Sequence, residues 1–359
     1  MKTKSFFLAI ILLALTGIGS IVLATPQEFR GVWLHSGLFD KNADVARGQI
    51  IKLFDSYQEI GINNLFCYYT LPEENGFEWD YLQALIDVGH KHGMKIHPVF
   101  CPGHDVALTG EIKDHPEWQI QDRDGKRIPN LNLTLPEVRN YWMRTISRVM
   151  KYDIDGIHLD YIRFPVNQRY SYDSVTCQAF KKEYGYTPKE ISQDDGSMLW
   201  CEWIKWNARQ ITELVKETRA LITRSGKKIL LGADVFPSPD TSPVLIGQDW
   251  ESWANMGLVD FICPMLYTND LKLFKEYTSR AVKIAGTGYA VYPGIGVKTS
   301  HNKITKDLLV KEVEIARETG AGGEIFFSGN SFDQEMRDAL KATVFKQSIN
   351  HPPVKTRGY

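Results

Sequence analysis

Short apolar segments alternate with longer amphipathic ones along the chain from residue 28 onward. Runs rich in β-branched and aromatic residues predict strands at 29–35, 63–69, 95–101, 156–161, 229–235, 260–267, 289–294 and 323–328. Apolar positions at helical spacing predict helices at 43–60, 79–92, 136–152, 172–184, 197–225, 249–256, 270–285, 305–319 and 332–345. The region 102–135 reads as a long loop.

This alternation predicts parallel strands joined by helical crossovers. Several of the strands are apolar at consecutive positions, as expected for a sheet covered on both faces. Eight such units favour an α/β fold, namely a single (β/α)8 TIM barrel. An open doubly wound sheet is the second choice, but the first strand is followed by HSGLFDKNAD, without a glycine-rich phosphate turn.

The first 24 residues have the layout of a secretory signal peptide. Lys2 and Lys4 precede an apolar run, and Val22-Leu23-Ala24 fits a cleavage site. A membrane anchor is the alternative, since the run has about the minimum length for spanning. We therefore expect a signal peptide at 1–24, a barrel at 25–345 and a loose tail at 346–359. The mature protein is then periplasmic or extracellular, without integral membrane association.

Composition narrows the function. The chain has 359 residues, 42 basic and 43 acidic side chains, and a formal net charge of −1. This balance does not support a nucleic-acid partner. The 5 cysteines include no CxxC pair, and we expect buried thiols, no metal and no cofactor. The sequence leaves the oligomeric state open.

In a TIM barrel the reactive residues lie at the carboxyl ends of the strands, so those positions supply the candidates. They are rich in aromatic, carboxylate and imidazole groups, which suit a carbohydrate substrate. The candidate substrate-binding residues are Trp33, His35, Tyr69, His97, His158, Arg163, Tyr267 and Glu324.

Asp160 is the first catalytic candidate. It lies near the end of a buried strand, where a carboxylate is costly unless it is solvated, paired or used. His158 and Asp160 point the same way, because strand side chains alternate. A purely structural ion pair between Asp160 and Arg163 is the alternative.

Asp234, on the neighbouring strand, is the second catalytic candidate. Two carboxylates beside an aromatic cleft are the machinery of glycosidic cleavage, with one protonated and the other ionised. Like charges at short range raise one pKa, which suits this division of work. Capping of the loop at 237–239 is the structural alternative for Asp234, and Glu324 is the next acid to consider.

Histidines offer a metal alternative, in which His97, His104 and His158 converge with Asp160. The chain has neither an HxH after the first strand nor HExxH, so we favour a metal-free site.

Three segments resemble the bacterial glycosyl-hydrolase-like family of exported barrels. They are residues 28–34 (EFRGVWL), residues 115–126 with HPEW and DGK, and residues 155–165 (DGIHLDYIRFP). The resemblance implies a (β/α)8 fold related to α-amylase-type barrels, polysaccharide or cell-wall glycan substrates, and Asp160 as the leading catalytic acid. Two positions depart from the pattern: Met265 replaces the usual Gln of the sixth strand, and Asp234 stands where amylase-type barrels carry Glu.

Three functions remain open at this point. The first is a glycoside hydrolase that acts on O-glycosyl bonds. The second is a carbohydrate-binding barrel without catalysis, and the third is a metal-dependent hydrolase. The sequence does not determine the sugar, the linkage or the stereochemical outcome.

Overall fold

The computed structural model describes residues 28–70, 76–104, 109–166, 170–193 and 196–346. The predicted signal peptide, and the predicted tail beyond residue 346, lie outside these residues. Within them, no helix is long and apolar enough to cross a membrane.

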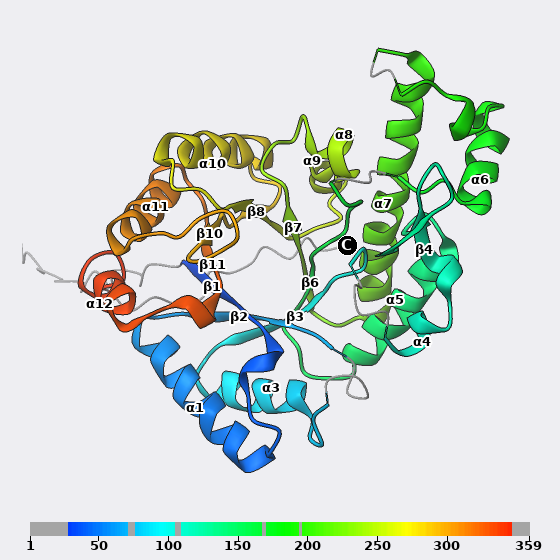
Figure 1. Ribbon diagram of the computed structural model, residues 1–359. Coiled ribbons are helices and arrows are strands. Elements are labelled where there is room, and N and C mark those ends of the chain that lie inside the picture. Colours follow the sequence, from blue (N-terminus) through cyan, green and yellow to red (C-terminus); the bar gives the residue numbers. More distant parts are fainter. Residues whose placement is uncertain (1–27, 71–75, 105–108, 167–169, 194–195, 347–359) are drawn as a thin grey trace, which may run out of the picture.

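The described chain forms a closed parallel barrel ringed by helices (Figure 1), as predicted. Its strands are β1 (Phe29–Leu34), β2 (Asn64–Tyr68), β3 (Lys95–Phe100), β6 (Gly156–Leu159), β7 (Leu230–Val235), β8 (Phe261–Leu266), β9 (Ala290–Val291), β10 (Gly294–Gly296) and β11 (Gly323–Phe327). The barrel closes because β10 pairs with both β8 and β11, and β11 pairs with β1.

The seventh strand was predicted as one piece at 289–294, but it is split in two. Residues of β9 pair with the start of β8, and residues of β10 pair with its end. Pro293 lies in the break and has no N–H to donate to a neighbouring strand. Its carbonyl accepts a hydrogen bond from the Ile325 N–H at 3.1 Å. Together, β9 and β10 occupy the place of one barrel strand.

The outer ring follows the predicted helices closely. It consists of α1 (Ala43–Glu59), α3 (Tyr81–Lys91), α5 (Pro136–Val149), α7 (Met198–Ser225), α9 (Trp250–Asn255), α10 (Leu271–Ala285), α11 (Lys306–Glu318) and α12 (Gln334–Ala342). Short polar side chains cap many of their amino ends: Asn42 accepts from two backbone N–H groups of α1, and Asp270 does the same for α10. These capping residues explain why the helix starts could be predicted from the sequence.

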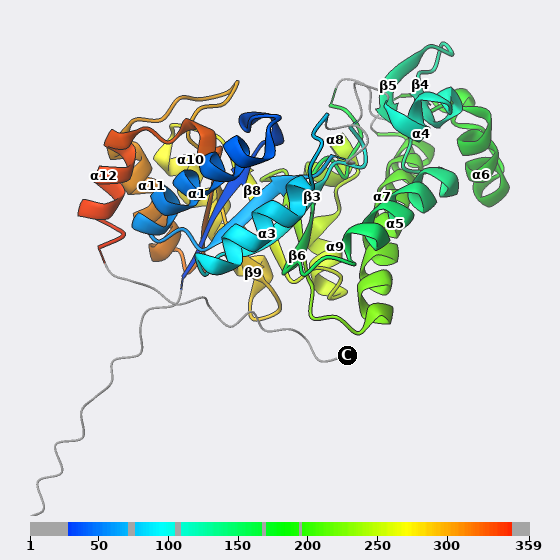
Figure 2. The same ribbon diagram turned by 90° about the horizontal axis from the view of Figure 1, so that it is seen from below.

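A lobe of additional elements lies to one side of the barrel (Figures 1 and 2). It contains α4 (Gly110–Lys113), the antiparallel pair β4 (Gln119–Gln121) and β5 (Arg127–Leu131), and α6 (Ser174–Tyr184). The hairpin was not predicted, since the region 102–135 reads as a loop. Its Asp124-Gly125 turn was the available signal, because Asp-Gly between short strands is typical of a tight hairpin.

The remaining short elements follow barrel strands or join helices. They are α8 (Ser242–Ile246) and the 3-10 turns η1 (Ser36–Leu38), η2 (Pro116–Trp118), η3 (Pro188–Glu190) and η4 (Gly329–Ser331).

Aromatic rings fill the inside of the barrel. Phe29 stacks on Tyr292 with ring centroids 3.9 Å apart, and Phe66 lies between Phe29 and Trp33. These rings form a packed cluster of buried side chains inside the barrel.

Candidate active site

A cavity of about 760 Å³ opens at the carboxyl ends of the barrel strands. Every strand position of the barrel contributes to its wall. The lining residues are His35, Tyr68, Thr70, Cys101, His104, Asp160, Tyr161, Arg163, Phe236, Pro237, Met265, Tyr267, Thr299, Ser300, His301 and Phe327.

Asp160 lies in this cavity, directly after β6, and is 3% exposed. Its Oδ1 accepts hydrogen bonds from the Tyr161 N–H at 2.6 Å and from Arg163 Nη1 at 3.2 Å. Its Oδ2 accepts one from the Tyr68 hydroxyl at 3.3 Å. The predicted ion pair with Arg163 is therefore present, and these donors hold the carboxylate in one orientation within the cavity.

The backbone after Asp160 is unusually shaped. Tyr161 has φ 49°, the left-handed region that a bulky residue seldom occupies. Its ring is packed between the His104 ring at 4.2 Å and the Arg163 guanidinium at 4.0 Å. Strained backbone of this kind collects at functional sites, where the surrounding packing sustains it.

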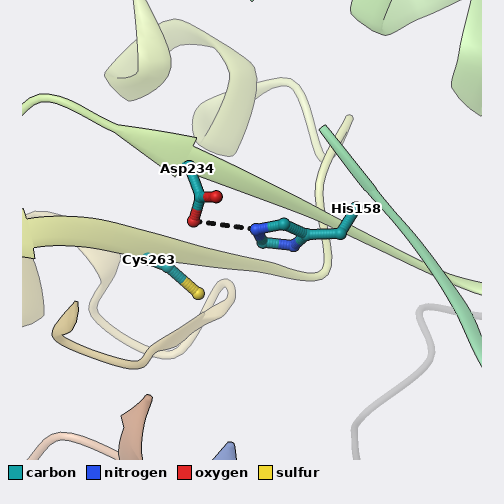
Figure 3. A group of neighbouring side chains, drawn as sticks. All are labelled: His158, Asp234 and Cys263. Carbon is teal, nitrogen blue, oxygen red and sulfur yellow. Dashed lines mark ion pairs between the residues drawn. The ribbon is translucent and has the colours of Figure 1, made fainter. Parts of the chain in front are cut away.

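Asp234 lies on β7 and is only 1% exposed. Its Oδ1 is 2.8 Å from Nε2 of His158, which is itself fully buried (Figure 3). Burial first, and then the charge of Asp160, raise the pKa of Asp234 well above its ordinary value, against the opposing effects of Arg163 and the Trp33 indole. Burial lowers the pKa of His158 to about 3. Burial thus favours the uncharged form of both side chains, the carboxylic acid of Asp234 and the imidazole of His158.

Cys263 on β8 completes a group with His158 and Asp234, in which the potential ligand atoms lie within 4.8 Å of one another (Figure 3). Ligands of one tetrahedral Zn²⁺, with bonds of about 2.1 Å, stand about 3.4 Å apart. The 2.8 Å between His158 Nε2 and Asp234 Oδ1 is shorter than that, so these two atoms would have to move apart to bind one ion together.

Comparison with known proteins decides the family. The family model described as "Glycosyl hydrolase-like 10" matches residues 69–305, which is more than half of the chain. The chain belongs to this glycosyl hydrolase-like family. The match confirms the expected kinship with glycosyl-hydrolase-like barrels.

The curated relatives of this glycosyl hydrolase-like chain are more distant. "Glycosyl hydrolase DigH" of Escherichia coli (strain K12) is 22% identical over 310 residues, covering 68% of this chain and 66% of that protein. The protein of the same name from Shigella flexneri gives the same values. The chain thus spans slightly less than two thirds of the length of these relatives.

Solved structures share the fold. The glycoside hydrolase domain of PgaB (BpsB) from Bordetella bronchiseptica has a TM-score of 0.72 at 11% identity, covering 90% of this chain and 100% of that one. The β-amylase catalytic domain of Paenibacillus polymyxa has a TM-score of 0.64 at 12% identity, covering 90% and 99%. Both likenesses concern the barrel alone.

The predicted site residues of this glycosyl hydrolase-like barrel separate by depth. Asp160, His35, Arg163 and Tyr267 line the cavity. Asp234, His158 and Trp33 are fully or almost fully buried. The cavity therefore has the predicted carboxylate Asp160 in its wall, while Asp234 is not among the residues that line it.

Three other predicted residues are not brought to the cavity. His97 is fully buried, stacks on Phe66 and has Nε2 at 2.9 Å from Asn64 Oδ1. Tyr69 packs against Phe100, with ring centroids 5.5 Å apart. Glu324 is buried near the start of β11, opposite Arg30 at the other end of the barrel. The predicted metal alternative needed His97, and that residue does not join His104 and Asp160.

Sequence reasoning missed two parts of the wall. Phe236 and Pro237 follow β7 directly, and Thr299, Ser300 and His301 come from the segment after β10. The polar run KTSHNK after a buried strand was a usable signal for the second part.

Proposed function

We propose that the protein is an exported glycoside hydrolase that cleaves O-glycosyl bonds of a polysaccharide or cell-wall glycan. The observation that carries this proposal is a pair of acids in opposite environments at the carboxyl end of a glycosyl hydrolase-like barrel. Asp160 is held by three donors in the cavity, while Asp234 is buried beside neutral His158. Such a contrast supplies the ionised and protonated carboxyls that glycosidic cleavage requires.

Each acid has a defined task in this proposal. Asp160, oriented by the donors around it, acts on the anomeric carbon as nucleophile or through a water. Asp234, whose pKa is raised, supplies the proton for the leaving oxygen. The aromatic faces of Tyr267, Phe236 and Phe327 in the wall are suited to packing against sugar rings.

A carbohydrate-binding barrel without catalysis is the second candidate, and one observation favours it. Asp234 is 1% exposed and is not among the residues that line the cavity. If no substrate reaches Asp234, the aromatic side chains of the cavity can still bind a glycan, but only one carboxylate of the pair is available for catalysis.

The test is turnover of the mature protein on a panel of cell-wall and polysaccharide glycans, with Asp160→Asn and Asp234→Asn variants. Asp160→Asn should reduce kcat by at least about a hundredfold with little change in the melting temperature, because the amide keeps the shape and loses the charge. Asp155→Asn is the matched control on the opposite end of β6, where Asp155 binds Lys95 and His90. It should lower stability and leave kcat nearly unchanged.

Each alternative has its own result. Glycan binding without turnover in the unaltered protein supports the binding barrel. Turnover that EDTA abolishes and zinc restores supports the metal-dependent hydrolase. Full activity of Asp160→Asn contradicts the proposed mechanism.

Export is part of the proposal and is tested separately. The charged start, the apolar run and Val22-Leu23-Ala24 predict a mature chain that begins near Thr25. Mass spectrometry of the native protein should find this amino terminus, and a protein that retains Met1 would contradict export by cleavage.

A further inference from the structure

A compact hairpin at residues 297–304 forms part of the cavity rim, between β10 and α11. The Thr299 N–H donates to the Asn302 carbonyl at 2.8 Å, and the Ile304 N–H donates to the Val297 carbonyl at 3.1 Å. Lys298 and Lys303 face each other across the hairpin as an antiparallel bridge. The tip places Thr299, Ser300 and His301 in the cavity wall.

Side chains hold this 297–304 hairpin in place. Asn302 Nδ2 donates to the Gly296 carbonyl at 2.8 Å, and its Oδ1 accepts from the Thr299 hydroxyl at 2.8 Å. Asn269 Nδ2, from the segment after β8, donates to the Lys303 carbonyl at 3.2 Å. A hairpin tied in this way offers its groups to a ligand in fixed positions.

The charge of the hairpin has one sign. It carries Lys298, His301 and Lys303 and no acidic residue, and all three side chains are exposed. Among the ion pairs of the described residues, none involves Lys298 or Lys303. These ammonium groups are available to a partner from outside the chain.

The cavity wall does not offset that charge. Asp160 is its one carboxylate among the described residues, and Arg163 pairs with it at 3.2 Å. Asp160 and Arg163 compensate each other, so within the described part of the chain no carboxylate of the cavity wall offsets the charge of the hairpin. A glycan that brings negative charge to this rim gains attraction, whereas a neutral glycan gains none.

We propose that the 297–304 hairpin is an anion-recognition site and that the glycan substrate carries carboxylate groups on the sugars held at this rim. This inference rests on the proposed function, because it assigns the class of glycan that the same cavity takes. Phosphate- or sulfate-bearing glycans share the chemistry of negative charge, and the test separates them from carboxylates.

The test measures glycan binding to the Asp234→Asn protein, which keeps the Asp160–Arg163 pair of the cavity and lacks the proton donor of the proposed function. The ligands are acidic bacterial polysaccharides, the same polysaccharides after chemical reduction of their carboxylates to alcohols, neutral glycans, and phosphate- and sulfate-bearing glycans. Binding to a carboxylate glycan should fall about tenfold on carboxyl reduction. It should also weaken in about 0.5 M salt, which screens exposed charges.

Matched variants locate the effect. Lys298→Gln combined with Lys303→Gln should weaken binding of the carboxylate glycan roughly three- to tenfold and should not change binding of its reduced form. Lys91→Gln combined with Lys151→Gln removes the same charge at the ends of α3 and α5, on the opposite face of the barrel. That control should bind as the parent does.

Every outcome decides between the proposals. Equal binding of the reduced and unreduced glycans overturns the inference while leaving a glycan-binding cavity. Preference for phosphate or sulfate glycans, insensitive to carboxyl reduction, overturns the carboxylate assignment and retains the anion site. If no glycan binds, the proposed function itself fails and the inference fails with it.

Discussion

Asp160 and Asp234 are the same residue type on adjacent strands, and their surroundings give them different properties. Asp160 lies one position beyond β6 and receives hydrogen bonds from Tyr161, Arg163 and Tyr68. Asp234 is a residue of β7 that does not line the cavity, and burial raises its pKa. The donors around Asp160 and the burial of Asp234 therefore give the two carboxyls different properties.

A third buried acid at the residue scale allows a test of stability that is independent of catalysis. Glu312 of α11 is fully buried, and burial raises its pKa from 4.5 to about 9. The folded state then binds a proton that the unfolded state has released between these two pH values, so stability falls as pH rises through this window. Glu312→Gln, which has no charge to bury, should escape this loss.

The expected difference is specific. The variant and the parent should have similar free energies of unfolding near pH 4.5, and the variant should gain up to about 1.4 kcal/mol per pH unit above it. Denaturant unfolding at several pH values measures this. Glu314→Gln, an exposed neighbour on the same helix, is the control and should follow the parent curve. If the free energy of unfolding depends on pH in the same way in Glu312→Gln and the parent, burial does not raise the pKa of Glu312 and the prediction is wrong.

Individual residues also show what the sequence can and cannot predict about a site. The alternation of side chains predicted that His158 and Asp160 point the same way, because the period of a strand is fixed by its geometry. It could not show how far along the barrel axis the packed aromatic core extends before the cavity begins. His97, Trp33 and His158 were expected to bind substrate, yet all are fully buried. That extent depends on the sizes of side chains from all strands, which no single segment contains.

At the scale of elements, the long helices and most strands were predictable because each has its own period and its own cap. Deviations occur where contacts between elements decide the structure. The seventh strand is divided at Pro293, and the predicted loop at 102–135 contains β4 and β5. The 297–304 hairpin was also missed, since its order comes from Asn269 and Gly296 as much as from its own residues.

One contact between elements supports the candidate site directly. Gly103, after β3, donates its N–H to the Tyr161 carbonyl at 2.9 Å. A Cβ at this position would stand 2.4 Å from the Tyr161 carbonyl oxygen and 2.6 Å from that of Arg163. Gly103→Ala should therefore displace the segment that holds Asp160 and lower kcat at least about tenfold.

A second glycine gives the matched control for this prediction. Gly48 lies within α1, and a Cβ there would meet nothing within 4 Å. Gly48→Ala should leave kcat unchanged and stabilise the fold by about 0.5–1 kcal/mol. Steady-state kinetics and thermal melts of both variants test the pair of expectations. Normal kcat in Gly103→Ala would mean that the loop after β6 can move without disturbing Asp160.

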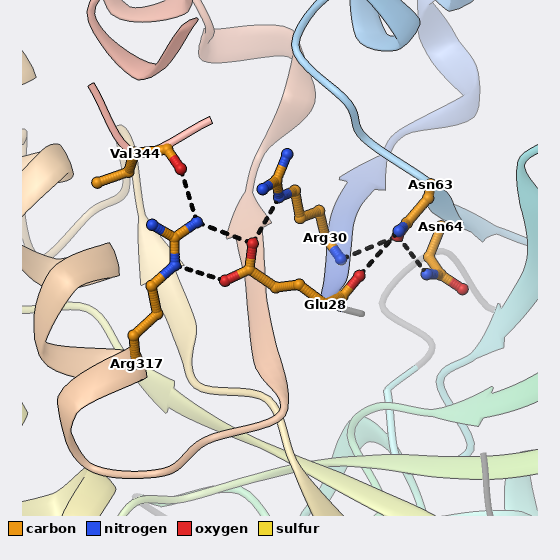
Figure 4. Close-up of polar contacts among 6 residues, drawn as sticks. All are labelled: Glu28, Arg30, Asn63, Asn64, Arg317 and Val344. Carbon is orange, nitrogen blue, oxygen red and sulfur yellow. Dashed lines mark hydrogen bonds and ion pairs between the residues drawn. The ribbon is translucent and has the colours of Figure 1, made fainter. Parts of the chain in front are cut away.

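At the scale of the whole molecule, a polar cluster joins the two ends of the described chain at the amino-terminal face of the barrel (Figure 4). Glu28, just before β1, accepts from Arg30 at 2.7 Å and from two nitrogens of Arg317 at 2.6 and 2.8 Å. Arg317 also donates to the Val344 carbonyl at 2.8 Å, beyond α12. Asn63 Nδ2 donates to the Glu28 carbonyl at 2.9 Å, which links the cluster to β2. The cluster thus fixes the first strand to the last helices.

The same cluster contains two buried acids that should respond in opposite ways to loss of charge. Burial alone would raise the pKa of Glu28, but the hydrogen bonds and charges of Arg317 and Arg30 outweigh it and lower that pKa. Glu324 has no such hydrogen bonds, and burial together with the Glu28 charge raises its pKa well above the ordinary value. Glu28 is consequently ionised at neutral pH, whereas burial favours the uncharged form of Glu324.

We therefore expect Glu28→Gln to destabilise the fold by about 3 kcal/mol, since it leaves the guanidinium of buried Arg30 without its partner. Glu324→Gln removes a carboxyl whose charge burial disfavours, and it should cost less than about 1 kcal/mol. The stabilisation from Glu28 is present above pH 4.5 and is lost as the pH falls through its lowered value, so the two variants should converge in acid. Both should keep the parent kcat when folded, because the cluster and the cavity lie at opposite ends of the barrel. Chemical denaturation at neutral and acidic pH measures the two costs, and equal costs at neutral pH would mean that Glu324 also carries a charge in the fold.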